Sequence, residues 1–302
     1  MEIRYIPFED IDKVKWNSCI HFAVNSEVSG YHWWLKAVVK EWDAIVEGDY
    51  ESVMPLFYQK DLWGRKVLYQ PKLLGKIGIQ SIHMLSRKRI IEMLNLLPET
   101  PSIQIQLNEM NILPPDLDIK SEQHTAHRLL LSKPLSVLRA AYSPEVRELI
   151  RKELPPGYFF QVMMKPEEIV EFCQKNKQLP YDQYESLRVF YNLLHRGTLV
   201  SNVLLDENKN PIALLVITYH MKKIKVLVTS QNKKGSDLKA IYRLYDHVFN
   251  LHQNKAMMFE FFHSDGEVAE GLGADEYVYW EIKQSDRLGN WSKRLKEMAI
   301  FN

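Results

Sequence analysis

The stretch KVLVTSQNKKGSDLKAIYRLYDHV, residues 225–248, opens with a β-branched apolar run and soon takes on a helical period. A strand, a loop and a helix are therefore expected in that order. Lysines just before a helix N-terminus are unfavourable unless an anion binds there, and Gly235 lets the backbone approach a ligand. Ser236 or Asp237 is expected to cap the helix. The loop QNKKGS is thus either an anion cradle or a solvated surface turn.

The residues around this stretch predict a mixed α/β unit in the C-terminal half. Turn residues and the change between strand and helix periods predict the order β-α-α-β-β-β-α-β-α-β, followed by a C-terminal helix at 291–298. Helices are expected at 166–177, 181–195, 237–251 and 267–272. The strands are expected in YFFQVMM, TLVSNVLLD, PIALLVITYHM, KIKVLVTS, AMMFEFF and YVYWEI.

The N-terminal half repeats much of this order with little residue identity. Helices are expected at 9–16, 31–39 and 86–97, and strands in EIRYIPF, WDAIVEG, SVMPLFYQ, KVLYQP, IQIQLN and TAHRLLLS. Prolines punctuate the chain between 131 and 156, where a helix at 144–154 bridges the halves. The sequence therefore predicts two units, 1–135 and 136–302, with mostly antiparallel mixed sheets and flanking helices, in the α+β class.

Composition indicates an ordinary globular protein. Of the 302 residues, 46% are hydrophobic and 25% are charged, and the formal net charge of +1 gives no support to a nucleic-acid partner. The two cysteines, Cys19 and Cys173, predict no disulfide framework and favour a reducing cytoplasm. No signal peptide or membrane span is expected.

The order of elements resembles the GNAT acyltransferase fold, and its doubling resembles the FemAB/FemX-like branch, in which two GNAT units lie in tandem. Three stretches carry this resemblance: VLVTSQNKKGSDLKAIYRLYDHVF, FEFFHS with the later GLGADEYVYWEI, and WDAIVEGDYESVMPLFYQ. The chain departs from the GNAT pattern at the loop, where Gly235 stands alone, and at the end of the penultimate strand, where Phe262 and His263 replace the family's residues.

The resemblance implies an N-acyltransferase that uses acyl-CoA as co-substrate and needs no metal. It assigns CoA binding to the end of the strand and the following loop, at Thr229, Ser230, Lys233, Lys234, Gly235 and Ser236. By the same resemblance, the amine acceptor is expected to be a small molecule or a peptidoglycan-precursor-like amine, and the sequence does not name it. Two alternatives stay open: a double-GNAT binding protein that has lost its chemistry, and a FemX-like aminoacyltransferase that uses aminoacyl-tRNA.

Acid–base residues are expected near the penultimate and last strands. A carboxylate among apolar neighbours can have a raised pKa, which makes Glu260 the candidate proton acceptor, although a solvent-facing position is the alternative. Tyr277 and Tyr279 share one strand face, so either can supply a proton, and Tyr279 is chosen. His263 and Ser264 at a strand end are expected to contact the substrate.

Other motifs carry less information. Trp33 is a candidate to line a substrate site, with core packing as the alternative. His124 and His127 are three residues apart, so a strand puts them on opposite faces, and no metal site is predicted. No phosphate-binding P-loop, dinucleotide fingerprint or nucleophile elbow occurs.

Overall fold

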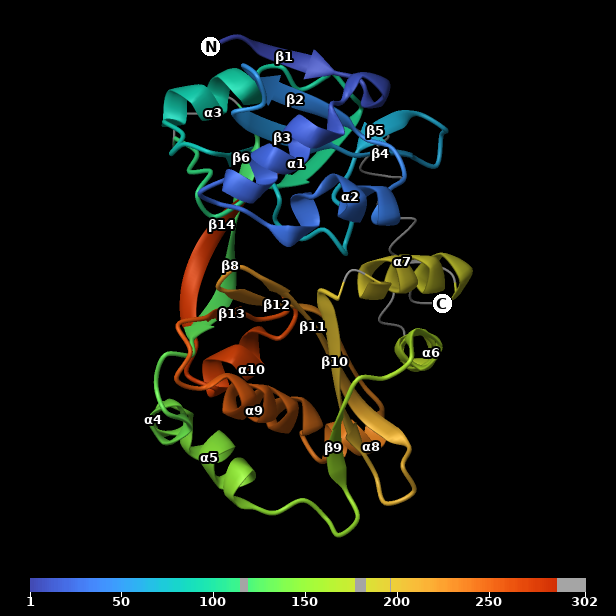
Figure 1. Cartoon of the computed structure of the whole chain (residues 1–302), viewed down its shortest axis with the longest axis vertical. Helices are drawn as coiled ribbons and strands as arrows, with labels where there is room; N and C mark the ends of the chain where they lie inside the picture. Colours follow the sequence, from blue (N-terminus) through green and yellow to red (C-terminus); the bar gives the residue numbers. More distant parts are fainter. Residues whose placement is uncertain (115–118, 177–182, 196, 287–302) are drawn as a thin grey trace. The chain divides into compact units, whose positions relative to one another are not determined.

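The computed structural model describes residues 1–114, 119–176, 183–195 and 197–286, and it divides into two compact units (Figure 1). The first unit comprises Met1–Thr125 and Val278–Asn302, and the second comprises Ala126–Tyr277. Two strands run across the division, β8 (Ser121–Leu130) and β14 (Asp275–Ser285). The helix predicted at 291–298 and the first residues of the helix predicted at 181–195 lie outside the described residues.

In the first unit, four antiparallel strands form a sheet in the order β1-β2-β3-β6, and β4 and β5 form a separate pair. β7 pairs with the C-terminal part of β14. The elements are β1 (Ile3–Ile6), α1 (Lys13–Phe22), α2 (His32–Val38), β2 (Asp43–Glu47), β3 (Ser52–Leu56), β4 (Tyr58–Lys60), β5 (Lys66–Leu68), β6 (Gln80–Ser81), α3 (Arg87–Leu94) and β7 (Ser102–Gln106), with short 3-10 turns at Phe8–Asp10 and Val28–Gly30.

In the second unit, six strands follow the order β8-β13-β12-β11-β10-β9. Each neighbouring pair is antiparallel except β12 and β13, which are parallel. The remaining elements are α4 (Leu135–Ala140), α5 (Pro144–Arg151), β9 (Phe159–Val162), α6 (Pro166–Lys175), α7 (Gln183–His195), β10 (Leu199–Leu205), β11 (Pro211–His220), β12 (Lys223–Gln231), α8 (Lys233–Asp237), α9 (Ala240–His252), β13 (Met258–Glu260) and α10 (Gly266–Gly271).

Helix α9 covers one face of this sheet, while α6 and α7 lie on the other side (Figure 1). The apolar positions of α9 recur at helical spacing, so that Leu244, Tyr245, Val248 and Phe249 are fully buried. They pack against the face of β11 and β12 and against Phe259 of β13. This core holds β12, β13 and α9 in fixed relation, which matters for the site below.

The predicted mixed α+β class with mostly antiparallel sheets is confirmed, and the order of elements matches closely. Three boundaries were wrong. The helix expected at 9–16 begins at Lys13, because Asp12 caps it by accepting from the N–H groups of Val14 and Lys15. The strand SVMPLFYQ divides into β3 and β4, and β5, from KVLYQP, pairs with β4 in the separate two-stranded sheet. Of the strand expected in AMMFEFF, only the three central residues form a strand, β13.

The loop QNKKGS was also predicted wrongly in its local structure. It contains the short helix α8, and α9 starts only at Ala240 rather than at 237. Asn232 caps α8, and neither Ser236 nor Asp237 caps α9, whose N-cap residue Lys239 makes no side-chain cap. The prediction that residues 1–135 and 136–302 are two similar GNAT-like units stays a prediction.

Candidate functional site

The parallel strands β12 and β13 pair briefly and then separate. Lys223, Ile224 and Lys225 lie opposite Met258, Phe259 and Glu260. Beyond this point β12 continues to Gln231, whereas β13 ends and the N–H of Phe261 donates to the carbonyl of His127 in β8 at 3.1 Å. Among the described residues, no strand pairs with 226–231 on the β13 side. Backbone N–H and C=O groups of β12 are therefore left for another partner.

A β-bulge lies in β12 where the separation begins. Val226 pairs with Ile217 and Val228 pairs with Val216 of β11, which leaves Leu227 without a counterpart. A bulge shifts the alternation of side chains by one residue. As a result, Thr229 lies opposite Leu215, whose side chain belongs to the core under α9.

Thr229 takes part in a hydrogen-bonded group with Tyr245 of α9 and Asp265. The Thr229 hydroxyl donates to Oδ1 of Asp265 at 3.3 Å, and the Tyr245 hydroxyl donates to Oδ2 at 2.7 Å. Burial raises the pKa of Asp265 to about 6, although these hydrogen bonds favour the ionised form. A carboxyl group with this pKa can exchange a proton near neutral pH.

Hydrogen bonds within the segment after β12 occupy several of its own polar groups. The Asn232 side chain accepts from the N–H of Gly235 at 2.9 Å, and the Asn232 carbonyl accepts from Ser236. A Cβ at Gly235 would lie 2.2 Å from the backbone oxygen of Ile212 in β11. Gly235 is therefore required for the packing of α8 on β11, a role that the sequence did not indicate.

The two lysines of this segment differ in their surroundings. Lys234 Nζ lies 3.0 Å from Asp206 Oδ2 and 3.1 Å from Glu207 Oε2, and its pKa is raised by hydrogen bonds to Tyr158 and to these carboxylates. Its charge is therefore largely matched within the protein. Lys233 is exposed at the start of α8, so it is the lysine available to an anion.

The other two residues assigned to CoA binding differ in exposure. Ser230 is buried near the end of β12, only 2% exposed, whereas Ser236 is exposed on α8. Their roles in binding CoA stay predictions.

Glu260 ends β13 and is 3% exposed, which differs from the solvent-facing alternative. Its carboxylate lies 3.8 Å from Lys223 Nζ and 4.0 Å from Lys225 Nζ. The apolar surroundings expected for it are thus replaced by two ammonium groups. His263 and Ser264 follow on an exposed segment, where the His263 ring contacts Phe262 edge-on. Their catalytic and substrate-binding roles stay predictions.

Two of the predicted residues belong to the first unit. Trp33 is partly exposed on α2 and stacks with Tyr31 at a centroid distance of 6.1 Å. Tyr279 is buried in β14, its ring stacks with His124 at 5.5 Å, and burial raises its pKa. A neutral phenol of this kind can donate a proton, and the assignment stays a prediction.

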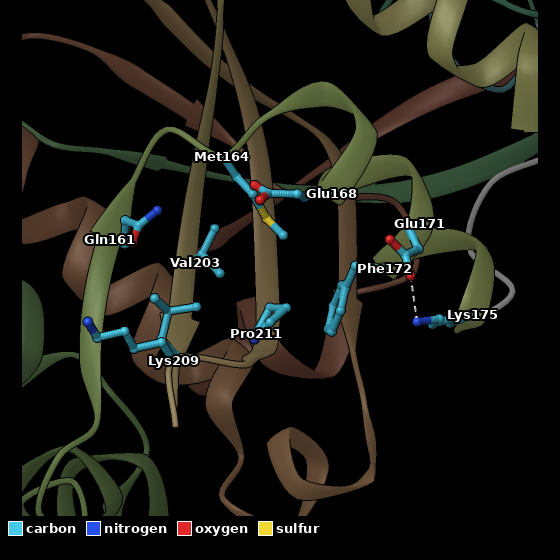
Figure 2. Close-up of a pocket in the computed structure, with 10 residues that line it drawn as sticks. Gln161, Met164, Glu168, Glu171, Phe172, Lys175, Val203, Lys209 and Pro211 are labelled. Atoms are coloured by element: carbon cyan, nitrogen blue, oxygen red, sulfur yellow. Dashed lines mark hydrogen bonds and ion pairs between the residues drawn. The ribbon is translucent and has the colours of Figure 1, made fainter. Parts of the chain in front are cut away.

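A pocket of about 360 Å³ lies beneath α6, on the side of the sheet opposite α9 (Figure 2). This volume is within the range of small-molecule sites. Its apolar part comes from α6 and from the strands β10 and β11, through Phe172, Val203, Leu205 and Pro211, with Met164 just before α6.

Charged groups of both signs surround that apolar part. Glu171 and Lys175 pair with each other at 2.7 Å on one side of the pocket (Figure 2). Within the part of the chain that the structure describes, the Glu168 carboxylate accepts only the backbone N–H of Lys165, at 3.2 Å, and Lys209 is exposed on the turn after β10. The pocket therefore suits a small ligand that has an apolar body and carries both an amine and a carboxylate.

The structure thus brings Thr229 together with two residues that sequence reasoning missed. The signal for Tyr245 was its place on the apolar face of the helix, and Asp265 directly follows the predicted substrate residue Ser264. Neither signal specified a hydrogen bond between them, because the residues are separated by 20 positions and meet only through the packing of α9.

Comparison with solved structures identifies the fold. FemX superposes with a TM-score of 0.63 at 9% identity, covering 96% of this chain and 99% of FemX. A tandem GNAT protein from the clavulanic acid biosynthesis pathway gives a TM-score of 0.51 at 12% identity, covering 94% of this chain and 100% of that one. L-PGS from Bacillus licheniformis gives 0.53 at 14% identity, with 98% of each chain covered.

Sequence comparison finds no such relative: no protein-family model and no curated protein matches the chain. The structural matches extend over nearly the whole chain, so the chain has the FemX-like double-GNAT fold, as the order of elements predicted. None of the described helices is both long and apolar enough to span a bilayer.

Proposed function

From this fold and the separation of β12 and β13, we propose that the protein is an N-acyltransferase that moves an acyl group from acyl-CoA to an amine. The observation that carries the proposal is the free edge of β12 at residues 226–231, next to the bulge at Leu227. An extended molecule with amide groups can hydrogen-bond to such an edge as an added strand does. The pantetheine arm of CoA contains two amides and fits this requirement.

The diphosphate of CoA needs positive charge and free N–H groups beyond the end of β12. Lys233 supplies an exposed ammonium group, and α9 begins at Ala240 without a side-chain cap. The first turn of a helix without a cap favours an anion. The N–H of Gly235 is already bonded to Asn232, so α8 itself contributes less than its sequence suggested.

The transfer requires one bond to form and one to break. The amine nitrogen attacks the thioester carbonyl carbon, the C–S bond breaks, and the thiolate takes up a proton. N–H groups on the free edge of β12 can polarise the carbonyl. Asp265 is our first candidate to accept the proton of the amine, directly or through water, because its pKa is about 6. Glu260 remains the alternative.

The pocket of Figure 2 lies on the face of the sheet opposite α9 and therefore opposite Asp265, so it is our candidate for binding a part of the acceptor that is remote from the reacting amine. Glu168 can bind an ammonium group and Lys209 a carboxylate, and the apolar surface between them can bind a side chain. This class includes amino acids and peptide ends, such as those in a peptidoglycan precursor. Glu168→Gln is expected to raise KM for the acceptor with little change in kcat, because the contact is the same in ground and transition states.

Titration with CoA tests the first part of the proposal. We expect the wild-type protein to bind CoA in calorimetry, and Lys233→Glu to weaken binding by about tenfold or more, since a charged hydrogen bond contributes about 1.5–3 kcal/mol. Lys60→Glu is the matched control, because Lys60 is an exposed lysine of β4 in the first unit. The double variant Lys233→Glu, Lys234→Glu is less specific, since it also breaks the pairs of Lys234.

Release of free thiol from acetyl-CoA in the presence of an amine panel tests the chemistry. CoA binding without turnover would favour the binding-protein alternative. No CoA binding, together with acyl transfer from aminoacyl-tRNA, would favour the tRNA-dependent alternative. Equal CoA affinity of the wild type and Lys233→Glu would show that the segment after β12 is an ordinary surface turn.

A further inference from the structure

Three residues of the second unit converge beside β8. His127 comes from β8, Glu270 from α10 and Glu276 from β14. The imidazole Nε2 lies 3.6 Å from Glu270 Oε1 and 3.9 Å from Glu276 Oε1. One ligand atom from each residue lies within 4.8 Å of the others. Two carboxylates at this separation repel each other unless a cation lies between them.

The burial of His127 gives a second, independent observation. Its side chain is only 9% exposed, and its Nε2 atom has no hydrogen-bond partner among the residues that the structure describes, although it points toward the two carboxylates. Both distances exceed the 2.7–3.2 Å range of an N–H···O hydrogen bond. A buried imidazole nitrogen left in this way is unfavourable unless something else binds it.

The spacing of these three ligand atoms suits a metal ion. Zinc binds imidazole nitrogen and carboxylate oxygen at about 2.0–2.2 Å, so tetrahedral ligand atoms lie about 3.3–3.6 Å apart. The nitrogen–oxygen distances of 3.6 and 3.9 Å need to shorten only slightly. Glu270 and Glu276 have side chains that are 61% and 63% exposed, so they can make that adjustment by rotating.

In a second cluster of the same residue types, other side chains of the protein already pair with the carboxylates. Glu122, His124 and Glu281 of the first unit also lie within 4.8 Å of one another. There, Lys283 Nζ lies 3.1 Å from Glu122, and Gln104 donates to Glu281 at 3.0 Å. An ammonium group in that position competes with a metal ion.

Among the described residues, neither Glu270 nor Glu276 has a lysine or arginine partner within 4.0 Å. This difference distinguishes their cluster from the one around His124.

We propose that His127, Glu270 and Glu276 form a binding site for a divalent transition-metal ion of the zinc type. One imidazole and two carboxylates suit zinc and its neighbours, whereas magnesium and calcium prefer oxygen ligands alone. Three protein ligands leave a fourth position for water or for a ligand group. The site lies outside the residues assigned to acyl transfer and does not depend on that function.

Calorimetric titration of the untagged, metal-free full chain with zinc chloride tests the site. We expect one zinc ion per chain, and we expect magnesium chloride at the same concentration not to compete. His127→Asn removes the nitrogen ligand and is expected to weaken zinc binding by at least about tenfold, since even outer-shell changes cost 10–100-fold. Cobalt in place of zinc is expected to give a visible tetrahedral absorption band that His127→Asn abolishes.

The other cluster provides the matched control. His124→Asn is expected to leave zinc affinity unchanged. If His127→Asn folds poorly, the double change Glu270→Gln, Glu276→Gln tests the same site at two exposed positions and is expected to weaken binding as strongly. Wild-type affinity in the double variant, a loss of binding in His124→Asn, or no zinc binding to the wild type would overturn the proposal.

Discussion

The substitution Asp265→Asn probes the carboxyl group at the separation of β12 and β13. In the unfolded chain this group titrates at 3.8, and in the folded protein burial moves its pKa to about 6. Unfolding therefore releases a proton between these values, and stability falls as pH rises through them. A shift of one pKa unit corresponds to about 1.4 kcal/mol. Relative to a side chain that does not titrate, ionisation of Asp265 therefore lowers the free energy of unfolding by about 3 kcal/mol at pH 7.5 and by about 1 kcal/mol at pH 4.5.

Asparagine removes this titration and keeps a side-chain oxygen for the Tyr245 hydroxyl. We expect Asp265→Asn to be more stable than the wild type by up to about 3 kcal/mol at pH 7.5, with the difference shrinking to about 1 kcal/mol at pH 4.5. Urea unfolding at several pH values measures both free energies. Asp275→Asn, at an exposed position of β14, is the control and should stay within about 0.5 kcal/mol of the wild type.

Activity gives a separate readout of the same substitution. If Asp265 accepts the proton of the amine, kcat falls in Asp265→Asn and the limb of the pH–rate profile near pH 6 disappears. A stability difference that does not change with pH, or a variant less stable than the wild type at pH 7.5, would refute the reasoning about burial. An unchanged pH–rate profile would leave Glu260 as the candidate base.

Three further substitutions test other parts of the structure. Gly235→Ala places a Cβ 2.2 Å from a backbone oxygen of β11, so α8 must move and the free energy of unfolding should fall by about 1–3 kcal/mol. Ser236→Ala, at an exposed position, is the neutral control, and an unchanged urea midpoint in Gly235→Ala would contradict the close approach. Asp246→Ala removes the bidentate partner of the half-exposed Arg139 and the acceptor of the Tyr142 hydroxyl, and it should lower the free energy of unfolding by about 1.5–3 kcal/mol in thermal or urea unfolding. Asp246→Asn should cost less, and equal losses argue against the charge. Glu260→Gln should lower kcat if this carboxylate accepts the proton, and unchanged turnover removes it from the mechanism.

Several features of the fold could be predicted from local patterns. The β-branched strand at 223–231, the apolar stripe of α9 and Pro166 at the start of α6 each specify their own structure through side-chain period and backbone preference. Their order along the chain was enough to predict a mixed α+β fold and its likeness to the FemX branch. Residue identity alone is too low to show this likeness, because it lies between 9% and 14% in the structural matches reported above.

The candidate site depended on features that local patterns do not contain. Ser236 and Asp237 have suitable side chains for capping the long helix, but they lie within the short helix α8, which Asn232 caps by accepting the N–H of Gly235, and α9 begins only at Ala240. Gly235 appeared to serve a ligand, and only the approach of β11 shows that it serves packing.

Long-range proximity decided the chemistry of the acidic residues. Asp265 has a raised pKa because packing buries it beside Tyr245, and Glu260 faces two lysines because β12 runs parallel to β13 at that point. The sequence showed His127 without a carboxylate partner, and the fold brings Glu270 and Glu276 to it from positions more than 140 residues away. Side-chain period is a property of neighbouring residues and can be read along the chain. Burial and charge environment depend on residues that meet only after folding, so the tertiary structure alone decides them.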